Sequence, residues 1–242
     1  MSQTKLPIAE IWVYLSGSPL FALVLTLSAY QIAVLIYERS GKNPLANPVG
    51  IAVILVSVAI QFAEMPYETY FEGARFVHFL LGTATVALAV PIFNGYMAFK
   101  QHWPALLLSL TCGALTSMIS AMAIAKLLGA DDTIVASLMM KSVTAPIAMG
   151  IAERIGASPT LTAVLAIITG IMGASVASFV LNAVGSRFWW QRGFALGTAA
   201  HGIGASRAFS VNPEAGTFAS LAMGLHGVLG ALLIPLLAHP FR

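Results

Sequence analysis

Long apolar runs separated by short polar stretches make up most of the chain. The hydrocarbon core of a bilayer is about 30 Å thick, and a helix needs roughly 20 apolar residues to cross it. Runs near this length predict membrane-spanning helices at residues 20–37, 48–62, 76–93, 103–125, 161–184 and 218–238. The acidic and basic residues between 64 and 75 are expected to lie in a polar loop.

Two further apolar runs carry polar residues at their centres. Residues 133–152 contain Lys141, and residues 194–209 contain His201 and Arg207. Irregular backbone at membrane depth is tolerated only where it is buried in protein or faces water. We expect both runs to be broken or re-entrant. The predicted fold is therefore an all-α polytopic membrane protein with about six to eight transmembrane segments.

Composition supports this fold class. The 242 residues are 58% hydrophobic and only 9% charged, with a mean hydropathy of +0.87, whereas roughly a quarter of an ordinary globular domain is charged. The one cysteine and the five scattered histidines, without an HExxH pair, exclude a multi-cysteine metal site and make a zinc hydrolase improbable. We expect no enzyme, cofactor or metal. The basic residues are dispersed, so no nucleic-acid partner is expected.

The expected domain organisation is a short interfacial segment at residues 1–18 and one transmembrane domain at residues 19–242. Gly113, Gly170 and Gly227 recur at a spacing of 57 residues. This spacing suggests internal repeats, since transporters are often built from them. The repeat units would lie near residues 76–128, 133–184 and 193–238. The alternative is coincidence, because a hydrophobic chain with 21 glycines aligns with itself easily.

The first interrupted segment offers a seat for an anion. Pro146 cannot donate to the helical hydrogen-bond ladder, and it disfavours helical geometry at the residue before it. The break would place Lys141 beside the hydroxyls of Ser142 and Thr144 and near a helix N-terminus, an arrangement that favours negative charge. In the alternative, Lys141 extends to a lipid headgroup. The apolar residues on both sides of the segment argue against that alternative.

The second interrupted segment is rich in glycine. Gly197, Gly202 and Gly204 are poor helix formers and allow a ligand to approach the backbone closely. Arg207 has the geometry to bind a carboxylate with two hydrogen bonds, and His201 titrates near neutral pH. A structural ion pair between Arg207 and Glu214 is the alternative. Three hydroxyl residues complete the candidate substrate site: Thr198, Ser206 and Thr85.

The same stretches resemble the LrgB/CidB family. The resemblance rests on Tyr-Phe-Glu-Gly-Ala at 70–74, the Leu-Gly-Thr-Ala-Thr stretch within 79–91, Lys-Ser-Val-Thr-Ala-Pro-Ile-Ala-Met at 141–149, and Gly-Thr-Ala-Ala-His-Gly-Ile-Gly at 197–204. It covers nearly the whole chain. The sequence departs from the family pattern at Thr83, Ala145 and Ser206, where proline, threonine and threonine are expected. A substrate role for Thr83 is therefore not assigned.

The resemblance implies two descriptions of function. One is a holin-like or antiholin-like modulator of murein hydrolase activity and autolysis, acting with a small LrgA/CidA-type membrane partner. The other is a carrier of small carboxylates, because the family includes the LrgB-like half of the plastid glycolate/glycerate transporter and relatives linked with pyruvate. It also implies a multi-pass protein of the cell inner (plasma) membrane, in contact with the lipid bilayer, and we expect a homo-oligomer such as a dimer.

The polar residues favour transport by alternating access. A holin needs no basic side chain in a broken helix at mid-membrane, whereas a carboxylate carrier needs cations and hydroxyl donors to offset the cost of removing an anion from water. Lys141 and Arg207 would then bind the anion, and His201 would tune or couple protonation. The helix breaks at Pro146, Gly197, Gly202 and Gly204 would supply backbone groups.

Overall fold

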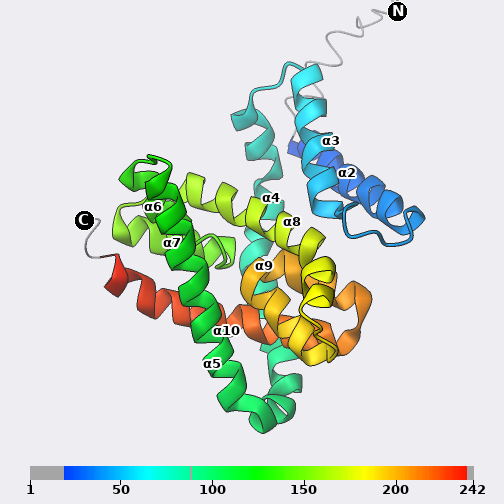
Figure 1. Ribbon diagram of the computed structural model, residues 1–242. Coiled ribbons are helices and arrows are strands. Elements are labelled where there is room, and N and C mark those ends of the chain that lie inside the picture. Colours follow the sequence, from blue (N-terminus) through cyan, green and yellow to red (C-terminus); the bar gives the residue numbers. More distant parts are fainter. Residues whose placement is uncertain (1–18, 88, 239–242) are drawn as a thin grey trace, which may run out of the picture. The chain divides into compact units, whose positions relative to one another are not determined.

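The computed structural model describes residues 19–87 and 89–238, so the expected interfacial segment at 1–18 lies outside the described residues. Within them the chain forms nine helices and no strand (Figure 1). The helices are α2 (Pro19–Arg39), α3 (Pro48–Phe62), α4 (Tyr67–Ala87), α5 (Ala89–Leu127), α6 (Asp132–Leu138), α7 (Ala145–Ile155), α8 (Pro159–Ala183), α9 (Trp189–Val211) and α10 (Pro213–Leu237). The all-α prediction is confirmed.

The chain divides into two compact units, Met1–Ala84 and Thr85–Arg242. In the first unit, α2 packs against α3. The Asn47 side chain accepts hydrogen bonds from two amides in the first turn of α3, at 2.9 and 3.1 Å, and so fixes the start of that helix. The hydroxyls of Thr26 and Tyr70 lie 2.8 Å apart and join α2 to α4.

Two predicted boundaries are wrong, one at the start of α4 and one between α4 and α5. The polar stretch between residues 64 and 75 is largely helical, because α4 begins at Tyr67. The expected crossing at 76–93 is divided between α4, which ends at Ala87, and α5, which begins at Ala89. Polar side chains at one end of a helix do not stop the backbone from satisfying its own hydrogen bonds, so hydropathy alone misplaced these boundaries.

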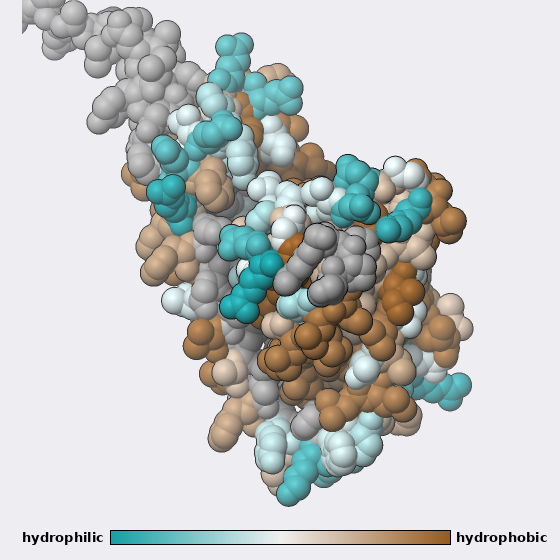
Figure 2. Space-filling model, turned by 90° about the vertical axis from the view of Figure 1, so that its left-hand side faces the viewer, coloured by the Kyte–Doolittle hydropathy of each residue, from teal (hydrophilic) through white to brown (hydrophobic). Residues whose placement is uncertain are grey.

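Among the described residues, four helices are long and apolar enough to cross a membrane: Leu20–Arg39, Lys100–Leu127, Pro159–Ala183 and Pro213–Leu237. The apolar helix α3 is shorter. Large hydrophobic side chains are exposed on these helices, such as Met172 at 62% and Phe179 at 57% on α8. Figure 2 shows hydrophobic side chains gathered over a broad area of the visible face. Such a surface suits contact with lipid.

In the second unit, α10 packs against α5, α7 and α9. Glycines allow the closest of these approaches. A Cβ atom on Gly193 would meet the backbone of Ala215, and one on Gly197 would meet the backbone of Ala219. Small residues spaced four apart let two helix backbones come together. Because 193 pairs with 215 and 197 with 219, the first half of α9 runs in the same direction as α10.

Candidate functional site

The chain between α6 and α7 is not helical. Residues 139–143 form consecutive turns, in which Lys141 N donates to Leu138 O at 3.3 Å and Val143 N donates to Met140 O at 2.9 Å. Thr144, with φ −59° and ψ 136°, precedes the first residue of α7, and its carbonyl accepts from the Ala148 amide. Pro146 lies in the first turn of α7, where its missing N–H costs no helical hydrogen bond.

The ammonium group of Lys141 contacts two hydroxyls. Its Nζ donates to Ser117 Oγ on α5 at 2.8 Å and to Ser142 Oγ at 3.3 Å, and the two hydroxyl oxygens are 3.0 Å apart. No carboxylate of the described residues lies within ion-pair distance of Lys141. An ammonium has three donors, so one is left for a ligand or water.

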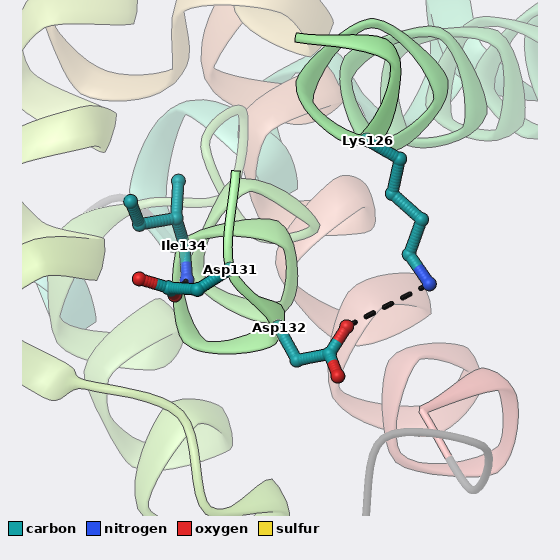
Figure 3. A network of polar contacts seen from close by, with 4 residues as sticks. All are labelled: Lys126, Asp131, Asp132 and Ile134. Atoms are coloured by element: carbon teal, nitrogen blue, oxygen red, sulfur yellow. Dashed lines mark hydrogen bonds and ion pairs between the residues drawn. The ribbon is translucent and has the colours of Figure 1, made fainter. Parts of the chain in front are cut away.

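Lys126 provides a contrast in the same unit. Its Nζ lies 3.6 Å from Asp132 Oδ1, and both side chains are largely exposed (Figure 3). The neighbouring Asp131 accepts a hydrogen bond of 2.8 Å from the Ile134 amide and so caps α6. The charge of Lys126 is thus balanced by an acidic side chain at the surface, whereas Lys141 is partly buried and is held by hydroxyls.

The helix α9 reverses direction at its centre. Ala200 (φ −124°, ψ 15°) and His201 (φ 41°, ψ −130°) have non-helical backbone angles. A Cβ atom on Gly204 would lie 2.5 Å from the carbonyl oxygen of Leu196, although eight residues of continuous helix span about 12 Å. The two halves of α9 therefore lie side by side and form a helical hairpin, whose tip is at Ala200 and His201.

The His201 side chain anchors this tip to α8. The imidazole is 4% exposed, and its Nε2 lies 2.8 Å from the carbonyl oxygen of Ala166. The ring fits against Gly170, where an added Cβ atom would lie 2.8 Å from Cε1 and 2.9 Å from Nε2. A positive φ is costly for a residue with a side chain. The buried hydrogen bond offsets part of this cost.

The two interrupted segments approach the same turns of α5 and α10. On α5, Gly113 faces the Thr198 side chain, whose methyl group would lie 3.6 Å from an added Cβ atom, and Ser117, one turn later, binds Lys141. On α10, His226 Nδ1 lies 2.8 Å from the Thr198 carbonyl oxygen. The next turn, at Gly230, faces Val143, whose side chain would lie 3.0 Å from an added Cβ atom. Lys141, Ser142, Thr198 and the hairpin tip therefore belong to one region of the unit.

A cavity of about 420 Å³ opens between α5 and the first half of α9. Most of its lining is apolar, and its polar side chains are Ser109, Ser117, Gln191 and Thr198. Trp190 lies at the end of the cavity away from Ser117, stacked on His102 with ring centroids 4.6 Å apart. Ser117 links the cavity to Lys141. Such a mostly apolar cavity with a few convergent polar groups suits a small ligand.

Arg207 lies away from this region, on the returning half of α9. It lines a separate cavity of about 30 Å³ together with Trp189 and Arg192, and Ser206 beside it is exposed. Within the described residues, Arg207 forms no ion pair with Glu214. The structure thus brings together Lys141, Ser142, Thr198 and His201 but not Arg207. The backbone of Thr85 lies in α4, and its side chain is outside the described ones.

The other predicted residues have local roles in the backbone. Gly197 allows contact with α10, and Gly204 allows the reversal of α9. A Cβ atom added to Gly202 would meet only the sulfur of Met223, at an ordinary 3.6 Å. Two residues of the site were missed in the sequence: Ser117 and His226. The four-residue spacing of Ala105, Ser109, Gly113 and Ser117 marks one face of a helix, but nothing in the sequence pairs that face with Lys141.

Comparison with known proteins identifies relatives along most of the chain. Residues 26–239 match the model of a family described as LrgB-like. The chain is 32% identical over 220 residues to the uncharacterized protein YxaC of Bacillus subtilis, covering 91% of this chain and 95% of the relative. It is 28% identical over 219 residues to the antiholin-like protein LrgB of Bacillus cereus, covering 90% and 95%.

A Haemophilus influenzae relative named only as an uncharacterized protein is 28% identical over 211 residues, covering 87% of this chain and 91% of its own length. No solved structure matches the chain significantly. The family match spans most of the chain, including both interrupted segments, three of the candidate membrane-spanning helices in full and most of the fourth, Leu20–Arg39. The chain belongs to the LrgB-like family of membrane proteins.

Proposed function

We propose that this protein transports small carboxylates of the glycolate, glycerate or pyruvate type across the cell inner membrane by alternating access. The observation that carries the proposal is the ammonium group of Lys141, which contacts two hydroxyls and no carboxylate among the described residues. Burying an unpaired charge is costly. A bound anion would offset that cost, and the adjoining cavity provides room for it.

The ligand set of the proposed site follows from these contacts. Lys141 binds the carboxylate, and Ser117 and Ser142 share its hydrogen bonds. Thr144 supplies a further hydroxyl, and His201 tunes or couples protonation. The Thr198 hydroxyl donates to the Phe194 carbonyl oxygen at 2.9 Å, so Thr198 would have to release this bond to donate to the carboxylate. The apolar lining would contact the short carbon chain. Arg207, Ser206 and Thr85 stay predicted ligands, and Arg207→Gln tests the first of them in the same uptake assay.

The hairpin of α9 is proposed to be re-entrant. Its tip lies level with Met223 of α10, which at 1.5 Å per residue is about 15 Å from the start of that helix at Pro213. This is half of a hydrocarbon core of about 30 Å. The tip would then lie at mid-membrane, where discontinuous helices form the substrate sites of many transporters. The three 57-residue repeat units stay a prediction.

The alternative function is modulation of murein hydrolase activity and autolysis. It is supported by the name antiholin-like protein LrgB that relatives carry. In that case a small LrgA/CidA-type membrane protein would be the partner, and lateral homo-oligomers, of which a dimer is the simplest, would act on the membrane. Carboxylate flux through a transporter would also alter membrane energetics, so the two functions are compatible in a cell.

Uptake into liposomes separates the two. The purified protein, with and without a small partner, should accumulate labelled glycolate, glycerate or pyruvate under an imposed proton gradient. Lys141→Met keeps the length of the side chain and removes its charge, so we expect uptake to fall by at least roughly tenfold, the loss of one charged interaction. Lys126→Met, at the exposed ion pair, is the matched control and should retain uptake.

The release of large dyes trapped in the liposomes tests the alternative, pore-forming function. If the wild-type protein accumulates none of the three acids but releases the dye, a pore-forming function replaces the transporter. If Lys141→Met transports like the wild type, the carboxylate is bound elsewhere. Monodispersity on size-exclusion chromatography should be the same for both lysine variants.

A further inference from the structure

The reversal of α9 leaves a carbonyl group that needs a partner. In a continuous helix, the Thr198 carbonyl would accept a hydrogen bond from the amide of Gly202. The non-helical angles at Ala200 and His201 lie between these two residues and interrupt that geometry. A buried carbonyl without a partner costs free energy comparable to a lost hydrogen bond.

The partner comes from α10. Nδ1 of His226 lies 2.8 Å from the Thr198 carbonyl oxygen, and the His226 side chain is 5% exposed. A carbonyl oxygen only accepts, so Nδ1 carries the hydrogen and donates. His226 thus caps the first half of α9 from a neighbouring helix, much as basic side chains cap helix C-termini from within their own chain segment.

This contact fixes a residue of the cavity wall. Thr198 lines the cavity of about 420 Å³, and its methyl group faces Gly113, one turn of α5 away from Ser117. Because α10 is a continuous helix over Pro213–Leu237, it provides a rigid support for the end of the first half of α9. Moving the Thr198 carbonyl would also move the Thr198 hydroxyl relative to Lys141.

We propose that His226 is a positioning residue of the carboxylate site: it holds the end of the first half of α9 through the Thr198 carbonyl and so sets the distance between Thr198 and the Lys141–Ser117 pair. The effect of His226 on uptake kinetics rests on the proposed transport function. The position of the end of the first half of α9 can be measured without transport.

The positioning role of His226 requires a hydrogen-bond donor at Nδ1. It does not require the imidazole to change its charge. Imidazole donates through Nδ1 in this tautomer and also when it is protonated. The titratable groups of the described residues that interact electrostatically with His226 are Lys141, from the segment before α7, and His201, from α9. The α5 residues beside His226 in a small cavity of about 20 Å³, Ala114, Leu115 and Met118, carry no titratable group.

Two substitutions distinguish donation from other roles. The amide nitrogen of His226→Asn lies near the place of Nδ1 and retains the donor, whereas His226→Leu removes it at similar volume. Each is combined with a reporter, Ala199→Cys in a Cys112→Ser background, because Ala199 is exposed, lines the cavity and follows Thr198. The measurements are the KM for uptake and the rate at which a water-soluble methanethiosulfonate modifies the reporter.

We expect His226→Leu to raise KM roughly tenfold with a smaller change in the maximal rate, and to change the modification rate by a similar factor. The asparagine variant should retain both values within about twofold. Uptake by the asparagine variant should depend on the proton gradient as uptake by the wild type does.

Three results would overturn the proposal. One is a leucine variant with wild-type KM and an unchanged modification rate. Another is an asparagine variant as impaired as the leucine variant although both elute as the wild type does. The third is an asparagine variant that loses its proton dependence, which would make His226 a proton carrier. If the wild-type protein transports no carboxylate, the proposed function fails, and the modification rates alone decide the role of His226.

Discussion

Lys141 and Lys126 have the same side chain in different surroundings. Lys126 is exposed beside Asp132, in the kind of surface pair that contributes about 0–1 kcal/mol. Lys141 is partly buried and is stabilised by the hydroxyls of Ser117 and Ser142. Hydrogen bonds to a charged group contribute about 1.5–3 kcal/mol each. The hydroxyls therefore decide how well the ammonium group is held in place for a ligand.

At this scale, Ser117→Ala removes the shorter hydrogen bond of Lys141, 2.8 Å in length. The ammonium group is then held less firmly beside the cavity, so we expect the KM for carboxylate uptake to rise roughly tenfold. The maximal rate should change less. Ser120→Ala, an exposed residue on the same helix, is the control. Equal KM values for the two alanine variants would remove Ser117 from the site.

At the scale of elements, α9 combines a close contact with a strained tip. Its first half packs through Gly193 and Gly197 on the backbone of α10. Its tip places His201 at φ 41°, and such a backbone costs about 1–3 kcal/mol for a residue with a side chain. Burial of the imidazole and its hydrogen bond to Ala166 offset this strain. The packing of α8 and α10 therefore maintains the reversal.

The two glycines that flank the tip should respond differently to alanine. In Gly197→Ala, the new Cβ atom meets the backbone of Ala219, which cannot move without separating α9 from α10. We expect the unfolding midpoint Tm in detergent to fall by about 5 °C or more.

In Gly202→Ala, the new methyl group meets only the flexible Met223 side chain at 3.6 Å. We expect a Tm within about 2 °C of the wild type, because alanine also favours the helix. The pair is measured together by thermal unfolding. Equal losses in both variants would show that helix propensity, and not contact with α10, sets the response.

At the scale of the whole molecule, the placement of the α9 hairpin in the membrane separates two architectures. If α9 is re-entrant, both of its ends lie on one side of the bilayer, and α10 alone crosses afterwards. If its halves each cross the whole bilayer, its two ends again lie on one side, but its tip at Ala200 and His201 reaches the other side. A site at a re-entrant tip is reached by water from one side at a time, as alternating access requires.

Cysteine labelling tests this placement. In a Cys112→Ser background, Arg187→Cys and Ser210→Cys report the two ends of α9, and Leu237→Cys reports the far end of α10. We expect a membrane-impermeant maleimide to label the first two from the same side of sealed vesicles and Leu237→Cys from the other. Labelling of Ala199→Cys, beside the tip, only from the side opposite Arg187→Cys and Ser210→Cys would contradict the re-entrant hairpin.

Much of the architecture could be predicted because lipid imposes simple rules on sequence. Apolar length fixed α3 to its observed bounds, Pro48–Phe62, and placed the long crossings near α2, α8 and α10. The polar residues inside apolar runs identified both interrupted segments, since charge and glycine are costly there. The start of α4 was missed because helix formation depends on backbone hydrogen bonds, which polar side chains do not prevent.

The sequence by itself thus determined the helical class, the membrane setting and the two places where regular helix ends, because each follows from the local cost of burying polar groups. Only the tertiary structure decided which residues meet there. It joined Lys141 to Ser117 and His226 to Thr198, and it put Arg207 at another cavity. Such partners lie up to 28 residues apart and are chosen by helix packing, which hydropathy and spacing do not encode.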